Sequence, residues 1–249
     1  RRILIFRIFE RFIYRQYRYV IAVSKIAEER IRKHLNDFSP RIRVIENGIN
    51  LKTISEAEPY PKDKLIPSFK TGDKLILNVA RFSKAKDHGT LIRSMTHLPE
   101  NYHLLLIGEG GLKVDFMNMA RELKLENRIH FLGARYDVLR ILKSVDIVVM
   151  SSFYEGSPLS AIEGMASGKP VAASDVSGLN ELVKDAGILF EQGNPADLAA
   201  KIILLLEDRN YAETVTIKCQ EKAAFFNIER TADQYFEIYQ SALQGNEHV

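Results

Sequence analysis

Short uninterrupted apolar runs alternate along the chain with stretches in which apolar residues recur every three or four positions. The first pattern is typical of strands buried in a parallel sheet, and the second of helices that cover such a sheet. Strands are expected at residues 19–24, 43–46, 74–80, 103–107, 128–132, 146–151, 171–173 and 188–190. Helices are expected at residues 2–17, 25–35, 88–98, 112–124, 138–143, 179–183, 195–207, 212–225 and 229–243. The alternation predicts an α/β fold, with a Rossmann-like parallel sheet and helices on both faces.

Residues 51–72 interrupt this alternation and are expected to be a polar, proline-containing connection. The charge is also uneven. Ten Lys and Arg residues but only three acids fall within residues 1–33, whereas the remainder of the chain is net acidic. A protein that binds nucleic acid is expected to spread its basic residues over a folded face, so we expect no nucleic-acid partner.

The basic residues near the start form a stripe on the helix expected within residues 1–18, at Arg7, Arg11, Arg15 and Arg18. Such a helix can lie on an anionic membrane surface. Alternatively, its apolar side packs on a further domain that this sequence does not contain, while the arginines face water. We favour this second interpretation, because the strand that follows also needs sheet neighbours. With no signal peptide or membrane-spanning run in sight, we expect a cytoplasmic protein, either free or peripheral at the inner membrane face.

The composition limits the chemistry further. With 249 residues, 46% of them hydrophobic, the chain can bury a core in one large or two small domains. Cys219 is the only cysteine, which excludes an internal disulfide and a Cys-based zinc cluster. The six histidines have no metal-ligand spacing, and we expect no metal or other cofactor. Gly108-Glu-Gly-Gly111 is a weak phosphate-loop signal, because it lacks the third glycine of the dinucleotide fingerprint.

The strongest chemical signal is a pair of glutamates, Glu155 and Glu163, separated by seven residues. Glu155 precedes a turn, and we expect Ser157 to cap the helix that follows and Pro158 to lie in its first turn. Glu163 would then lie about a turn and a half inside that helix. Free amides at a helix start bind anions, and carboxylates on either side can hold hydroxyl groups. This combination suits a sugar diphosphate.

Two cations, Arg81 and Lys86, follow an expected strand, and open α/β sheets bind ligands at the carboxyl ends of their strands. They could neutralise a pyrophosphate, or they could be a solvated basic loop. The paired carboxylates also leave alternatives open. One alternative is a glycoside hydrolase, which needs two carboxylates flanking the scissile bond. The other is that the two glutamates are unrelated surface residues without a shared function.

Together, the pair of glutamates, the upstream Arg81-Phe-Ser-Lys-Ala-Lys86 and the downstream Gly168-Lys-Pro-Val-Ala-Ala-Ser-Asp175 resemble the donor half of a retaining glycosyltransferase with the GT-B fold. The closest group is family 4, which transfers sugars from nucleotide diphosphate donors. The similarity runs from about Val20 to the end of the chain. One departure is Ala80-Arg81-Phe82, where the family commonly has Gly-Arg-Leu.

The resemblance implies roles for individual residues. Arg81 and Lys86 would contact the donor diphosphate, together with Ser157, Pro158 and Leu159. Glu163 would hold the ribose hydroxyls. Glu155, with Gly156, would lie near the transferred sugar and is the candidate catalytic residue. The residues expected near the nucleotide base are Leu132, Gly133 and Arg135.

We therefore expect the C-terminal donor-binding portion of a hexosyltransferase that uses a UDP-, GDP- or ADP-sugar and acts with retention. Its acceptor would be a glycan or a lipid-linked saccharide, in surface polysaccharide or glycoconjugate synthesis. Residues 1–40 would be the remnant of a missing N-terminal acceptor domain, residues 41–228 the nucleotide-sugar domain, and residues 229–249 a helix crossing back. The truncated chain alone is expected to be inactive. Alternatives are a non-catalytic nucleotide-sugar-binding fragment and an enzyme like the nucleotide-sugar 2-epimerases.

Overall fold

The computed structural model describes residues 9–10, 12–14, 16–35 and 41–244. Their contacts form two compact units, one within residues 1–49 and 226–249 and the other within residues 50–225. The helix predicted at residues 2–17 falls largely outside the described residues, and Arg18 is the only described member of its arginine stripe.

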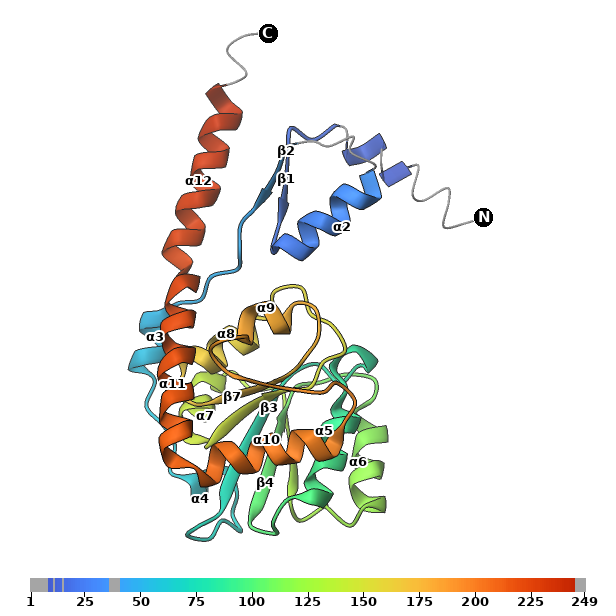
Figure 1. Ribbon diagram of the computed structural model, residues 1–249, viewed down its shortest axis with the longest axis vertical. Helices are drawn as coiled ribbons and strands as arrows, with labels where there is room; N and C mark the ends of the chain where they lie inside the picture. The colour runs from blue at the N-terminus through green and yellow to red at the C-terminus, as the bar shows by residue number, and fades with distance from the viewer. Residues whose placement is uncertain (1–8, 11, 15, 36–40, 245–249) are drawn as a thin grey trace. The chain divides into compact units, whose positions relative to one another are not determined.

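The larger unit is built on a sheet whose six described strands are all parallel, in the order β5-β4-β3-β6-β7-β8 (Figure 1). The strands are β3 (Lys74–Val79), β4 (Tyr102–Ile107), β5 (Ile129–Gly133), β6 (Ile147–Met150), β7 (Val171–Ser174) and β8 (Ile188–Phe190). Every residue of β4, β6 and β7 is buried, as expected for strands covered on both faces. The predicted Rossmann-like sheet is confirmed.

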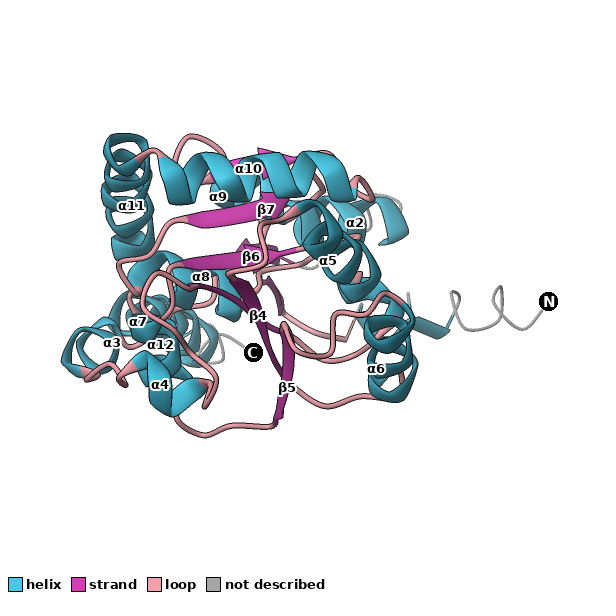
Figure 2. Ribbon diagram, turned by 90° about the horizontal axis from the view of Figure 1, so that it is seen from below, coloured by secondary structure: helices cyan, strands magenta, loops and turns pink. Residues whose placement is uncertain are grey.

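Helices cover both faces of this sheet. Figure 2 shows α5, α6 and α10 on one face and α7 and α8 on the other. The helices of this unit are α3 (Leu51–Glu56), α4 (Lys62–Leu65), α5 (His88–Ser94), α6 (Lys113–Glu122), α7 (Val138–Ser144), α8 (Leu159–Ala166), α9 (Leu179–Val183), α10 (Pro195–Glu207) and α11 (Arg209–Ala223). Helices α8, α9 and α10 pack directly on the strands, and α5 packs on α10. The core therefore lies in two layers, one on each face of the sheet.

The strand order places a topological switch point between β3 and β6. From β3 the chain moves outward through β4 to β5, and then it crosses back to β6 on the other side of β3. The loops that leave the carboxyl ends of β3 and β6 therefore diverge to opposite faces of the sheet. Ligands of open α/β sheets bind in the crevice at such a point.

The smaller unit contains a second, two-stranded parallel sheet. It pairs β1 (Tyr19–Ala22) with β2 (Arg41–Val44), and α2 (Lys25–Leu35) connects the two strands. The long helix α12 (Ile228–Gln244) joins this unit through a bridge between Ile49 and Asn227. The Thr231 hydroxyl also donates to the Glu46 carbonyl, at 3.1 Å.

Three sequence predictions are wrong in detail. The strand expected at residues 43–46 is β2, which pairs with β1 and does not join the six-stranded sheet. The connection expected at residues 51–72 contains α3 and α4, and Asn50 caps α3 by accepting from the Thr53 amide at 3.0 Å. These helices are too short for periodicity to reveal. The α-helix expected at residues 88–98 ends at Ser94 and continues as one 3₁₀ turn.

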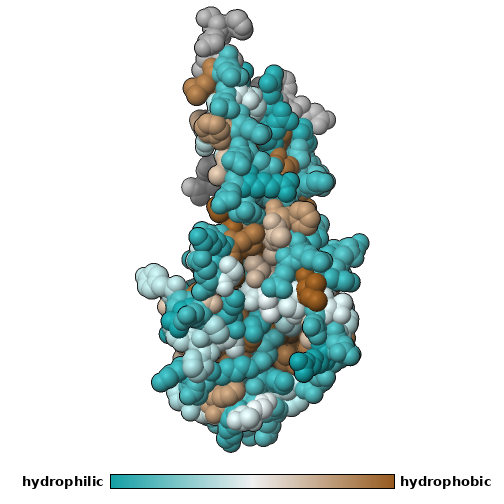
Figure 3. All heavy atoms as spheres, turned by 90° about the vertical axis from the view of Figure 1, so that its left-hand side faces the viewer, coloured by the Kyte–Doolittle hydropathy of each residue, from teal (hydrophilic) through white to brown (hydrophobic). Residues whose placement is uncertain are grey.

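The surface carries apolar side chains in several groups on an otherwise mainly hydrophilic face (Figure 3). Helix α12 has no buried residue, and its Phe236, Tyr239 and Leu243 are each at least 60% exposed. Among the described helices, none combines the length and the apolar character needed to cross a membrane.

Candidate functional site at the carboxyl ends of the central strands

The loop after β3 is held in one shape by the start of α5. It ends in a 3₁₀ turn, Lys84–Lys86, and Asp87 follows in the left-handed conformation, with φ +44°. The Asp87 carboxylate accepts from the Thr90 amide at 3.2 Å and from the Thr90 hydroxyl at 2.7 Å. This cap fixes the backbone immediately after Lys86, and so it fixes where the Lys86 side chain starts.

The loop after β6 is tied directly to the loop after β3. The Phe153 amide donates to the Ala85 carbonyl at 2.8 Å, and the Ser151 hydroxyl donates to the Lys86 carbonyl at 3.0 Å. As a result Lys86 and Glu155 meet, although they are far apart in the sequence. The Lys86 Nζ lies 2.5 Å from the Glu155 Oε1, and the Glu155 residue is only 8% exposed. Two residues predicted for one site therefore form an ion pair at the topological switch point.

Glu155 has a second, neutral partner that the sequence did not reveal. The Ser152 hydroxyl donates to the same Oε1 at 2.6 Å, and the Ser174 hydroxyl at the end of β7 donates to the Ser152 carbonyl at 2.6 Å. Gly178 lies against the backbone of Glu155, because a Cβ on Gly178 would be 2.1 Å from the Glu155 carbonyl oxygen. The only sequence signal for these serines is their position directly after buried strands.

The start of α8 differs from the prediction. Pro158 has an extended backbone, with ψ 110°, and occupies the N-cap position, so the helix begins at Leu159. The expectations that Ser157 is the cap and that Pro158 lies in the first turn are wrong by one residue. Proline offers no amide and no capping side chain. The amides that open the helix, those of Leu159 and Ser160, have no preceding helical turn to supply carbonyl partners.

Glu163 lies on α8, about one turn after the helix begins at Leu159. It is half-buried, and desolvation raises the pKa of its carboxyl. Its neighbour Gly164 allows α8 to approach β6 closely, since a Cβ on Gly164 would be 3.0 Å from a Val148 methyl. Among the described residues, no hydrogen bond or ion pair joins the side chains of Glu163 and Glu155.

Arg81 is exposed directly after β3, and no ion pair is recorded for it within the described part of the chain. Beside it, the glycines of the 108–111 loop have a packing role. The φ of Gly108 is +145°, and a Cβ there would be 2.1 Å from the Ala80 carbonyl oxygen. A Cβ on Gly110, where φ is +159°, would be 2.3 Å from the Phe82 carbonyl oxygen. This weak phosphate-loop signal therefore reflects the close packing of two loops, with glycine required at both contacts.

The three residues expected near a base lie in different surroundings. Gly133 ends β5 with φ +69°, and its carbonyl accepts from the Gly108 amide at 2.9 Å. Leu132 is half-buried in the same strand. Arg135 donates to the Asp137 carboxylate at 2.6 and 2.8 Å, and this pairing lowers the pKa of Asp137 to about 2. The guanidinium of Arg135 is thus already paired in this structure.

His88, at the start of α5, is part of the core. It is fully buried against Phe82 and Phe116, with ring centroids 4.6 and 5.2 Å away, and neither ring nitrogen has a hydrogen-bond partner in the described structure. Burial, with a smaller effect of Lys86, lowers its pKa to about 4. Its imidazole is therefore neutral at pH 7.

We expect the free energy of unfolding to fall as the pH drops from 6.5 towards 4, because the unfolded chain then binds a proton that folded His88 rejects. The shift from 6.5 to about 4 corresponds to a loss of about 3 kcal/mol. The variant His88→Leu removes this contribution and is at least as stable at pH 7, since it deletes two unpaired buried nitrogens. Urea unfolding at pH 7 and pH 4.5 measures both effects. An unchanged pH dependence in the variant would refute this explanation.

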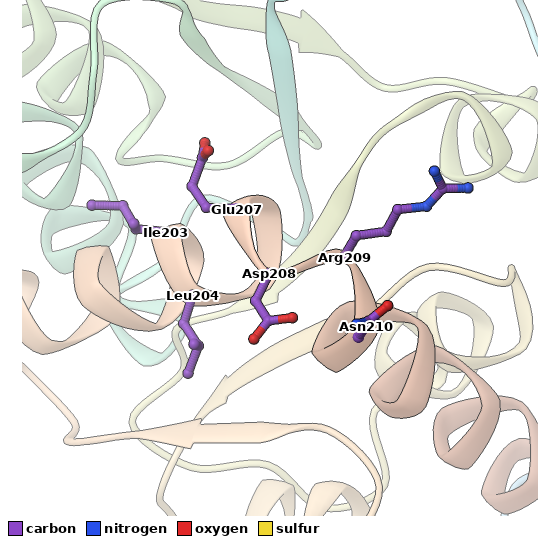
Figure 4. A pocket seen from close by; sticks show the side chains of 6 residues that line it. All are labelled: Ile203, Leu204, Glu207, Asp208, Arg209 and Asn210. Carbon is purple, nitrogen blue, oxygen red and sulfur yellow. The ribbon is translucent and has the colours of Figure 1, made fainter.

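Among the described residues, no group of three or more His, Cys, Asp or Glu side chains is arranged to hold a metal ion. One surface hollow lies away from the loops described above, at the junction of α10 and α11, lined by Ile203, Leu204, Glu207, Asp208, Arg209 and Asn210 (Figure 4). Leu204 and Asp208 point to the same side and Glu207 points away. None of the residues predicted for a site lines this hollow.

Known proteins share both this sequence pattern and this fold. The model of the family described as "Glycosyl transferases group 1" matches residues 61–222, more than half of the chain. A Campylobacter jejuni relative, N,N'-diacetylbacillosaminyl-diphospho-undecaprenol alpha-1,3-N-acetylgalactosaminyltransferase, is 29% identical over 82% of this chain and 56% of its own length.

Solved structures of known proteins are similar to this chain in fold. The Anabaena protein HepE in complex with UDP has a TM-score of 0.79 and 25% identity, over 90% of this chain and 64% of its own. Sucrose-phosphate synthase from Thermosynechococcus elongatus has a TM-score of 0.84 and 28% identity, over 96% of this chain and 62% of its own. The chain therefore spans less than two thirds of the length of each of these proteins. The fold is that of the GT-B glycosyltransferases, and the chain belongs to the glycosyl transferases group 1 family.

Proposed function

We propose that this chain is the donor-binding portion of a retaining glycosyltransferase, which transfers a hexose from a nucleotide-diphosphate sugar to a glycan or lipid-linked acceptor. The observation that carries the proposal is the Lys86–Glu155 pair at the switch point, at 2.5 Å, beside the start of α8. It puts a cation, a carboxylate and helix-start amides at the edge where open α/β sheets bind nucleotides.

Each part of the donor has a matching group in this arrangement. Lys86 and the exposed Arg81 are the cations for the diphosphate, and the Leu159 amide at the helix start is a further donor to it. Ser157 and Pro158 shape the turn that leads into that helix. The half-buried Glu163 accepts from the vicinal ribose hydroxyls.

The chemistry follows from where charge develops. When the glycosidic bond to the diphosphate breaks, negative charge grows on the leaving group and positive charge grows on the anomeric carbon. Arg81 and Lys86 stabilise the leaving diphosphate, a role in which we expect no metal ion to be needed. Glu155, next to Gly156, orients the sugar or stabilises the positive charge. Closure of the two domains of the intact enzyme would exclude water.

The acceptor side of the proposal rests on the relatives. The name of the Campylobacter jejuni relative specifies a diphospho-undecaprenol-linked saccharide as its acceptor. On the donor side, HepE has also been solved with UDP-glucose. Because this chain spans little more than half of the Campylobacter protein, we assign acceptor binding to a domain outside it. Synthesis of a surface polysaccharide or glycoconjugate is the setting that fits such an acceptor.

Titration calorimetry of this chain with UDP, GDP and ADP tests the donor site. We expect one nucleotide to bind, and Arg81→Ala or Glu163→Ala to weaken that binding by about 1–3 kcal/mol, the value of a charge-assisted hydrogen bond. Lys84→Ala is the matched control, because it removes a cation from the same loop and should cost far less. The proposal fails if a folded sample binds none of the three nucleotides, or if the control weakens binding as much as Arg81→Ala does.

A further inference from the structure

A chain of hydrogen bonds crosses the carboxyl ends of three neighbouring strands. It begins at β7, where the Ser174 hydroxyl donates to the Ser152 carbonyl at 2.6 Å. Ser152 follows β6, and its own hydroxyl donates to the Glu155 Oε1 at 2.6 Å. The chain ends at Lys86 in the loop after β3, whose Nζ is 2.5 Å from the same oxygen.

Except for Lys86, the members of this chain are buried. Ser174 is 0% exposed, Ser152 is 1% exposed and Glu155 is 8% exposed. A hydrogen bond to a carboxylate is stronger in such surroundings than at the surface, and it is more costly to leave unmade. The Ser152 hydroxyl has this one recorded acceptor, so its direction is fixed by Glu155.

Both recorded donors to the Glu155 carboxylate, Ser152 and Lys86, end on Oε1. Lys86 alone could follow the carboxylate as it rotates, since a lysine side chain is long and flexible. The short Ser152 side chain cannot, because its backbone is held by Ser174 on one side, while Phe153 is held by Ala85 on the other. Ser152 is therefore the rigid member of the pair of donors.

We propose that Ser152 is a positioning residue. By donating to Oε1 of Glu155, it keeps that oxygen directed toward Lys86, so that Oε2 faces the transferred sugar. The inference deepens the proposed function and rests on it. In the intact site Lys86 must share its charge between Glu155 and the incoming diphosphate. Ser152 supplies Oε1 with a second donor during that exchange, so the carboxylate keeps its orientation while Lys86 turns to the phosphates.

Ser151 provides a useful contrast. It is equally buried and adjacent in sequence, but its hydroxyl donates to the backbone carbonyl of Lys86. It therefore joins the two loops without touching the carboxylate. A general structural effect of losing a buried serine would be shared by both positions, whereas control of the Glu155 carboxylate belongs to Ser152.

The test compares binding of a nucleoside diphosphate with binding of the corresponding nucleotide sugar. The probes are UDP with UDP-glucose, GDP with GDP-mannose and ADP with ADP-glucose, titrated into this chain. We expect Ser152→Ala to weaken the nucleotide sugar about tenfold, the effect of one hydrogen bond to a charged group, while the nucleoside diphosphate changes less than about twofold. Ser152→Thr, which keeps the hydroxyl, should restore most of the loss.

Controls separate positioning from folding. Ser94→Ala removes an equally buried hydroxyl that donates to the Leu91 carbonyl within α5, and should change neither affinity. If Ser152→Ala does not fold, Ser152→Cys carries the test, because it keeps the shape and weakens the donor.

Equal losses for both kinds of probe, or no loss for either, would overturn the positioning role while leaving the donor site in place. If wild type binds nucleoside diphosphates but prefers no nucleotide sugar over them, a sugar-facing Glu155 is refuted, and Ser152 with it. If wild type binds neither kind of probe, the proposed function fails, together with this inference.

Discussion

Replacing Lys86 with alanine is expected to weaken nucleoside diphosphate binding by about tenfold to a hundredfold and to lower the free energy of unfolding by about 3 kcal/mol. Binding suffers because Lys86 is the cation fixed at the switch point. Stability suffers because Glu155, only 8% exposed, loses its cation. Calorimetric titration and urea unfolding of the same sample measure the two effects.

A second variant separates these effects. Lys86→Met combined with Glu155→Gln replaces the ion pair by neutral side chains of similar volume, so most of the lost stability should return. Nucleotide binding should stay weak, because no cation has been restored. If Lys86→Ala is as stable as wild type and binds nucleotide normally, the pair at 2.5 Å is no part of the donor site.

Gly178→Ala is expected to destabilise the larger unit by about 3 kcal/mol or more, from backbone strain and steric clash together. Gly178 has φ +92°, and an added Cβ would lie 2.1 Å from the Glu155 carbonyl oxygen. The backbone of Glu155 would have to move, so the Lys86–Glu155 distance and nucleotide binding should change with it. Urea unfolding measures the first effect and calorimetry the second.

Gly72→Ala is the matched control, because Gly72 has a similar φ of +100° but nothing lies within 4 Å of the added Cβ. It bears only the conformational strain, about 1 kcal/mol, and leaves nucleotide binding intact. Equal destabilisation by the two substitutions would show that contact with Glu155 adds nothing, and that Gly178 serves the turn alone.

The apolar pattern predicted most of the fold because parallel strands are buried on both faces, and continuous apolar runs such as Leu104–Ile107 identify them. It did not show which strands pair. The run at residues 43–46 has the same local signal as a strand of the large sheet, yet it pairs with β1. That choice depends on contacts between distant segments, and no local window contains them.

The position of a candidate residue was predictable where the residue follows the end of a buried strand. Lys86 and Glu155 both follow buried strands, and the structure brings them together. The predicted cap of α8 was wrong by one residue, because Pro158 has an extended backbone and the helix begins only at Leu159. Ser152 was missed, because its importance comes from one hydrogen bond to Glu155 and not from a motif.

A crystal structure of this chain with the nucleoside diphosphate that binds best would show whether the donor binds at the switch point between β3 and β6. We expect the diphosphate within hydrogen-bond distance of Lys86 and of the amides that open α8, with the ribose hydroxyls on Glu163. A nucleotide bound elsewhere, for example in the polar hollow lined by His103 and His130, would contradict it. So would an empty switch point in crystals grown at saturating nucleotide.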